Sequence, residues 1–160
     1  VATIIHEATH QIAFNCGLQT RYADIPLWLS EGIAVYFETP DLKRSKGWPA
    51  IGAINRPRLA RFRAYCEHRP ADSLASLITD DYRFRDRHES LDAYSEAWAL
   101  TYHLIRRRPK QFVQYLQVLS EKEPLFTDTP ETRLAEFKAA FGDDLERIDV
   151  ELLRKVRDLR

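Results

Sequence analysis

The stretch that decides the fold is VATIIHEATHQIAF, residues 1–14. It is mostly apolar and contains neither proline nor glycine, which predicts a helix. His6 and His10 are four positions apart, so on a helix they share one face and can point at the same ion. Glu7 would lie beside that ion without binding it, where its carboxylate can accept a proton from a water molecule. The pattern H-E-x-x-H therefore predicts a metal site that needs a further protein ligand.

The stretch LWLSEGIAVYFE, residues 27–38, supplies a candidate for that ligand. It is apolar almost all round, which predicts a buried helix. The carboxylate of Glu31 in its middle would cost several kcal/mol unless it were paired or bound to a metal. We therefore expect Glu31 to be the third ligand; the alternative is an exposed residue on a polar helix edge. Gly32 costs about 1 kcal/mol of helix propensity relative to alanine, which is easier to accept where two helices approach closely.

These two motifs together resemble those of a known family. HEATHQ (residues 6–11) followed by WLSEGIAVYFE (residues 28–38) is similar to the gluzincin metallopeptidases. In that group the two histidines of H-E-x-x-H and a downstream glutamate bind zinc. The chain most resembles a bacterial family of gluzincin-like peptidases whose function is not assigned. Softer matches extend the similarity from residue 1 to about residue 119: IGAINRPRL (51–59), SLASLIT (73–79) and YSEAWALTYHLI (94–105).

The resemblance implies an enzyme, a zinc-dependent peptidase that acts on a peptide or protein substrate. Zn²⁺ would be held by His6, His10 and Glu31, with one coordination position left open. Glu7 would act as the general base in hydrolysis of the peptide bond. The competing hypothesis is a non-catalytic, zinc-stabilised binding module, but a purely structural site gains nothing from a carboxylate at Glu7. An all-helical scaffold without a metal would require both motifs to be coincidences.

A tyrosine is the candidate for a second catalytic group. In the zinc aminopeptidase branch of the gluzincins, a tyrosine that opens a later helix donates a hydrogen bond to the developing oxyanion. Tyr94, in AYSEAWAL, resembles that tyrosine in its local pattern and in its order after Glu31. Tyr82, His88 and His103 are alternatives for this role. Tyr94 can also be interpreted as a core aromatic residue with its hydroxyl at the surface.

The residues at two positions that follow Glu31 in the chain, Val35 and Glu38, refine the resemblance. Glu38 lies on the same helix face, two turns further on. It can accept the free ring N–H of a zinc-bound histidine, or it can simply be the polar end of the helix. Thermolysin-like gluzincins carry an acid four residues after the glutamate ligand, where this chain has Val35. The resemblance therefore points away from the thermolysin branch.

The resemblance also sets the expected fold. Gluzincins place an antiparallel sheet ahead of the H-E-x-x-H helix, whereas only residues 1–5 precede the motif here. We expect a mainly α fold in which residues 1–160 form one helical subdomain, the helical lobe of a thermolysin- or aminopeptidase-like catalytic domain. The upstream β-sheet, absent from this chain, would be its partner within a longer protein and would bind extended substrate by strand addition. An extracytoplasmic location, secreted or periplasmic, is weakly favoured by the resemblance alone.

The composition excludes several classes of partner. The chain has 160 residues, which fits one domain with a sizeable core. Its formal net charge is zero, which argues against a nucleic acid or an anionic membrane as the main partner. No apolar run approaches the length needed to span a bilayer. Cys16 and Cys66 could form one disulfide, although two half-buried, unpaired thiols are favoured.

Helical patterns dominate the chain, and no stretch alternates like a strand. Gly17 is expected to end the first helix. The long segment 39–56 can line a cleft or can be a plain surface connection. The run Arg106-Arg107-Arg108 suits the dipole of a helix C-terminus and predicts a solvated basic end. The predicted helices cover residues 1–16, 26–38, 57–68, 72–79, 90–107, 109–121, 130–141 and 143–158.

Overall fold

The structure, a computed structural model, describes residues 2–39 and 51–159, and the regular structure within these ranges is entirely helical. The predicted mainly α class is therefore confirmed. The helices of the described residues are α1 (Ala2–Asn15), α2 (Leu27–Phe37), α3 (Arg56–Tyr65), α4 (Ser73–Thr79), α5 (Tyr82–Arg85), α6 (Ser90–Arg107), α7 (Pro109–Ser120), α8 (Pro130–Phe141) and α9 (Leu145–Asp158).

Most helix boundaries lie close to the predicted ones. Gly17 has a φ of +77°, the left-handed conformation that ends a helix most easily at glycine. α3 ends at Tyr65, earlier than predicted, and the single turn α5 was not predicted because four residues carry no readable period. Residues 40–50 of the predicted loop lie outside the described residues. Cys16 and Cys66 are both free, as the favoured interpretation predicted, but both are exposed and the predicted half-burial is wrong.

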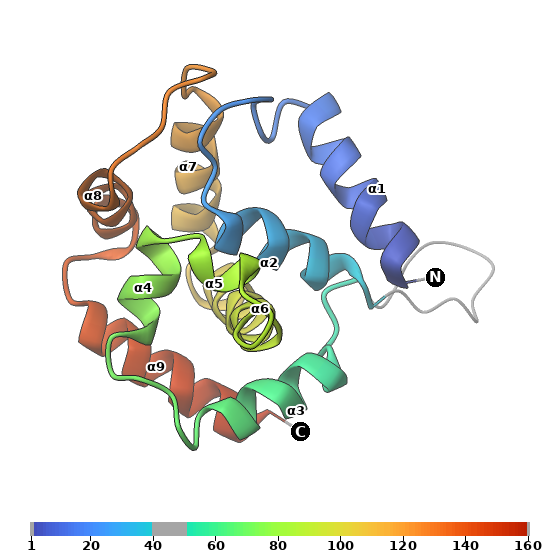
Figure 1. The fold of residues 1–160 in the computed structure, drawn as a ribbon, viewed down its shortest axis with the longest axis vertical. Helices are drawn as coiled ribbons and strands as arrows, with labels where there is room; N and C mark the ends of the chain where they lie inside the picture. The colour runs from blue at the N-terminus through green and yellow to red at the C-terminus, as the bar shows by residue number, and fades with distance from the viewer. Residues whose placement is uncertain (1, 40–50, 160) are drawn as a thin grey trace.

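Helix α6 occupies the centre of the fold. Figure 1 shows it almost end-on, with the other helices arranged around it. It contacts α2, α3, α4, α5, α7 and α9, and α1 packs on the outer side of α2. Twelve of its residues are buried, including Trp98, Leu100 and Leu104, so most of its circumference faces the core. Any side chain on α6 is consequently positioned by several neighbouring helices.

Helices α2 and α6 approach each other closely at Gly32. A Cβ atom at this position would lie 2.2 Å from Thr101 Oγ1 and 2.7 Å from the carbonyl oxygen of Ala97. These distances are far inside van der Waals contact, so only glycine allows the two helix backbones to come this near. The close approach that Gly32 suggested in the sequence is present, and it fixes the position of the preceding residue, Glu31.

A buried ionic network ties the segments around α6 together. Glu96 on α6 is fully buried, with 0% of its surface exposed. Its carboxylate accepts hydrogen bonds from Arg69 Nε at 2.8 Å, Arg83 Nη2 at 2.9 Å and Ser73 Oγ at 2.8 Å. Two guanidinium groups therefore offset the cost of removing this charge from water. No local sequence pattern indicates this network, because its members come from four separate segments.

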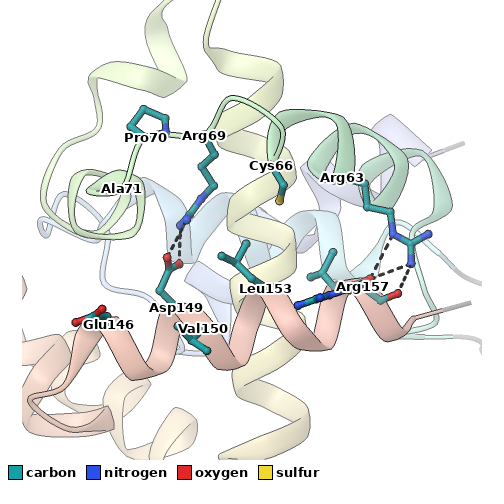
Figure 2. A pocket seen from close by; sticks show the side chains of 11 residues that line it. Arg63, Cys66, Arg69, Pro70, Ala71, Glu146, Asp149, Val150, Leu153 and Arg157 are labelled. Carbon is teal, nitrogen blue, oxygen red and sulfur yellow. Dashed lines mark hydrogen bonds and ion pairs between the residues drawn. The ribbon is translucent and has the colours of Figure 1, made fainter.

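Helix α9 is attached to α3 and to the segment that follows α3. Figure 2 shows Arg69 reaching across to Asp149, with two hydrogen bonds of 2.7 and 2.8 Å. Arg63 donates to the carbonyl oxygens of Val156 and Arg157, at 2.9 and 3.1 Å, where the last turn of α9 leaves them free. A groove of about 610 Å³ lies between these two attachments. No helix within residues 2–39 and 51–159 is long and apolar enough to cross a membrane.

Replacing Gly32 by alanine should destabilise the protein although alanine favours helix. We expect the free energy of unfolding to fall by about 1–3 kcal/mol, the usual cost of overpacking. Urea denaturation of Gly32→Ala measures this loss. Adding Thr101→Ala, which removes the nearest obstructing atom, should recover part of it. A Gly32→Ala protein as stable as the wild type would show that the helices can separate without cost.

Candidate metal centre

Helices α1 and α2 bring three potential metal ligands together. His6 Nε2 lies 3.2 Å from His10 Nε2 and 3.1 Å from Glu31 Oε2. His10 Nε2 lies 3.6 Å from Glu31 Oε1. The side chains of His6, His10 and Glu31 are 14%, 16% and 15% exposed. Glu31 therefore lies at the edge of the core, with access to solvent, rather than fully inside it as its sequence context predicted.

The outward ring nitrogens of both histidines are held by hydrogen bonds. His6 Nδ1 lies 2.8 Å from Glu38 Oε1, and because the carboxylate can only accept, Nδ1 carries the proton. His10 Nδ1 lies 3.3 Å from Ser30 Oγ. Ser30 donates its own proton to Gln19 Oε1 at 3.3 Å, so it accepts from His10. This network assigns the Nδ1–H tautomer to both neutral rings and turns both Nε2 lone pairs toward the cluster.

The separations between the three donor groups fit a tetrahedral ion. Zinc lies about 2.0–2.2 Å from histidine nitrogen and carboxylate oxygen, which places tetrahedral ligands about 3.4 Å from one another. The separations of 3.2, 3.1 and 3.6 Å in the cluster bracket that value. Two lone pairs and a carboxylate at such distances repel one another unless a positive charge lies between them. The donor set and its spacing therefore fit a zinc-sized cation.

The electrostatics of the cluster favour an added positive charge. Hydrogen bonds to Glu31 and then to Glu38 raise the pKa of His6 to about 9, although burial acts in the opposite direction. Burial opposes ionisation of Glu31, but its hydrogen bonds with His10 and His6 outweigh this and lower its pKa to about 2. A proton on His6 Nε2 meets this demand in the protein alone. A metal cation would replace that proton.

A second layer of contacts connects the cluster with α3. Glu38 uses its other oxygen to accept from Asn55 Nδ2 at 3.3 Å. Asn55 Oδ1 in turn accepts from the backbone N–H of Arg58 at 3.2 Å and so caps the N-terminus of α3. The Arg58 guanidinium lies 5.5 Å from the centre of the Tyr94 ring. The orientation of His6 is thus linked through Glu38 to the start of another helix.

Tyr94, on the second turn of α6, lies beside the cluster. Burial, together with the neighbouring carboxylates of Glu31 and Glu7, raises the pKa of Tyr94 to about 12, and Arg58 opposes this rise. The hydroxyl therefore remains protonated at neutral pH and can donate a hydrogen bond. Glu7 is an exposed residue of α1.

The three alternatives to Tyr94 have other surroundings. Tyr82 is 59% exposed, and its hydroxyl donates to Asp86 at 3.3 Å. His88 is exposed in the segment before α6. His103 is buried about two and a half turns beyond Tyr94, which places it on the opposite face of α6. Among the described residues, none of the three forms a hydrogen bond or ion pair with His6, His10 or Glu31.

Comparison with known proteins places the chain in a family. The family described as "Protein of unknown function (DUF1570)" matches residues 1–126. The chain belongs to this family. The match includes the three potential ligands, Glu7 and Tyr94, and it ends before α8. No curated protein and no solved structure matches the chain. The predicted membership of a family without an assigned function is thereby confirmed, whereas the gluzincin relationship is not tested by these comparisons.

Several residues of the second layer were not identified from the sequence. Asn55 had a readable signal, because an asparagine two residues before Pro57 is a typical helix N-cap. Ser30 could have been noted as the neighbour of Glu31. Gln19, 2% exposed in the connection between α1 and α2, has no local signal, because only the return of the chain brings it to Ser30.

The buried His103 should make stability depend on pH. Burial lowers its pKa to about 4; Arg108, Arg107 and Lys155 act in the same direction, and Glu151 opposes them. In the unfolded chain His103 has a pKa near 6.5. Between pH 6.5 and 4 it therefore binds a proton in the unfolded chain but stays neutral in the folded protein. The stabilising effect of the neutral ring is complete above pH 6.5 and is lost as the pH falls toward 4.

Comparison with His103→Leu isolates this effect, because His6 and the other groups titrate equally in both proteins. Between pH 7 and pH 5 the wild type should lose about 1–2 kcal/mol more unfolding free energy than the variant. Urea denaturation at both pH values measures the difference. An equal loss in the two proteins would contradict a depressed pKa at His103.

Proposed function

We propose that this protein is a zinc-dependent peptidase of the gluzincin type. The observation that supports this most strongly is the convergence of two imidazole Nε2 atoms and a carboxylate at the separations of tetrahedral ligands. His6, His10 and Glu31 would hold the ion. Among the described residues no fourth histidine, cysteine or carboxylate joins this group. A three-ligand site is typical of catalytic zinc, whereas structural zinc is usually closed by a fourth ligand.

The residues around the ligands have the roles that peptide hydrolysis needs. When bound, zinc supplies Lewis acidity, which lowers the pKa of a water molecule to about 7 and polarises a carbonyl group. Glu7 accepts the proton of the attacking water and then delivers it to the leaving amine. Its exposure on α1, beside the ligands, suits a group that must reach both water and substrate. Tyr94 donates a hydrogen bond to the oxyanion that develops on the substrate carbonyl.

The outer face of α1 supports the proposed docking of a sheet. Ile4 is 73% exposed and Ile12 is 64% exposed. With Ala8 between them they form an apolar stripe at helical spacing, on a helix whose buried residues are Ile5 and Ala13. An antiparallel sheet packed on this stripe would cover the face of α1 that is turned away from His6 and His10, because positions 4, 8 and 12 lie about half a turn round the helix from positions 6 and 10. We propose that a β-sheet of the same protein binds extended substrate as a further strand, so that peptidase activity requires this sheet as well as residues 1–160.

The test combines metal content with activity. Purified protein should contain about one zinc ion per chain by elemental analysis, and Glu31→Ala should contain far less. Glu7→Gln should retain its zinc and lose peptidase activity on a casein-type substrate, measured in the protein extended by its native upstream sequence. Glu67→Gln is the matched control and should behave as wild type. Glu67 is an exposed acid just beyond the C-terminal end of α3, whereas Asn55 precedes the N-terminal end.

Two outcomes would change the conclusion. Absence of stoichiometric zinc, even after incubation with the ion, would exclude a zinc enzyme. Stoichiometric zinc with activity that is unaffected by Glu7→Gln, or with no activity in the extended protein, would favour the non-catalytic zinc-stabilised binding module.

Removing the Glu38 carboxylate should weaken zinc binding without removing a ligand. Glu38→Gln can no longer accept the His6 Nδ1 proton as a charged partner, so the ring loses basicity and orientation. The zinc dissociation constant should rise by about 10–100-fold. Competition with a chromogenic chelator measures it, with Glu67→Gln again as the control. An unchanged affinity for zinc would show that Glu38 is only the polar end of α2 and does not support the binding of zinc by His6.

A further inference from the structure

We propose that the pocket between the C-terminal half of α6 and helix α9 is a binding site for a phosphate group. This α6–α9 pocket has a volume of about 510 Å³, within the usual size range of small-molecule sites. It is separate from the candidate metal centre, because it lies on the face of α6 opposite Tyr94. The residues that line it are His103, Arg107, Arg108, Glu151, Arg154, Lys155 and Asp158.

The charges that line the α6–α9 pocket favour an anion. Its four cationic side chains outnumber its two carboxylates. One of these carboxylates, that of Glu151, is already engaged by Arg108 at 3.1 Å and by Arg147 at 3.1 Å. Among the described residues, Arg107, Arg154 and Lys155 form no ion pair, so their charges remain available to a ligand.

His103 provides independent evidence for a ligand. It is 2% exposed, and neither ring nitrogen has a hydrogen-bond partner among the described residues. An unsatisfied buried polar group costs about 1–3 kcal/mol, so such groups are rare in native proteins and call for an explanation. The imidazole contributes to the wall of the α6–α9 pocket. A phosphate oxygen in the pocket would be the acceptor for its ring N–H after a small adjustment of the side chain.

Helix dipoles explain only part of this arrangement. Arg107 lies in the last turn of α6, and Lys155 lies in the last turn of α9, where cations are favoured even without a ligand. This accounts for the positive charge at each helix end. It does not account for a buried imidazole without partners, nor for the hollow around which the cations from two helices converge. Arg107 and Arg108, two residues of the basic run expected to be a solvated helix end, thus line a pocket.

The residue types indicate a phosphate group as the ligand. Guanidinium groups match the geometry of phosphate oxygens with paired N–H donors, and here they come from α6 and α9 together. The remaining volume leaves room for the organic part of a phosphomonoester. Asp158, the second carboxylate, can accept a hydrogen bond from a hydroxyl group of the organic part of the ligand. Inorganic phosphate and a phosphomonoester share the recognised chemistry and are distinguished by affinity.

Isothermal titration calorimetry with inorganic phosphate and with glycerol 3-phosphate tests the proposal. Saturable binding of one equivalent is expected, tighter for the phosphomonoester if the organic part is also held. Arg154→Gln should weaken it about tenfold or more. Arg157→Gln is the matched control, because Arg157 is an arginine of the same helix that lines the groove on the α3 side instead (Figure 2).

Two further measurements separate this site from the metal centre and from nonspecific attraction. Glu31→Ala should leave phosphate affinity unchanged, since any phosphate bound at the metal centre would be lost with the metal. The imidazole C–H resonance of His103, assigned through His103→Gln, should shift on titration with phosphate in the wild type. Binding that is not saturable, that weakens equally in Arg154→Gln and Arg157→Gln, or that leaves the His103 resonance unmoved would overturn the proposal.

Discussion

The close packing of α2 against α6 at Gly32 is the constraint on which the rest of the structure depends. The absence of a side chain allows the α2 backbone to contact Thr101 and Ala97 directly. Glu31, the residue before Gly32, is thereby held at the edge of the core. α1 packs on the outer side of the same helix and brings its two histidines to that carboxylate. α6 presents Tyr94 from the inner side.

Two carboxylates near the core are satisfied in different ways, and the difference has a chemical meaning. Glu96 is surrounded by Arg69 and Arg83, whose permanent positive charges neutralise it. Glu31 is instead approached by two imidazoles, which are neutral unless protonated. The Glu96 network is complete without any added ion, and it holds helices together. The Glu31 cluster is complete only with a proton or a cation, which is the property of a binding site.

The two candidate sites lie on opposite faces of α6. One face carries Tyr94 and borders the potential metal ligands of α1 and α2. The other carries His103 and borders the basic residues of α9. His103 lies about two and a half turns beyond Tyr94, and the residues that line the α6–α9 pocket include none of the potential metal ligands. The two sites can therefore be studied independently, by substitutions on α2 for the first and on α9 for the second.

The sequence by itself determined the class of the fold, most helix boundaries and the three potential metal ligands that the structure brings together. These are local properties: helical periodicity, helix-ending residues and the four-residue spacing of His6 and His10 can all be read from neighbouring positions. Glu31 could be added because burying a carboxylate in an apolar helix costs free energy unless the group is paired or binds a metal. Only the tertiary structure decided the rest. The acceptors that orient the two imidazoles, the Glu96 network and the pocket around His103 join residues from distant segments. Their partners are fixed by how the helices pack, and no local pattern records that packing.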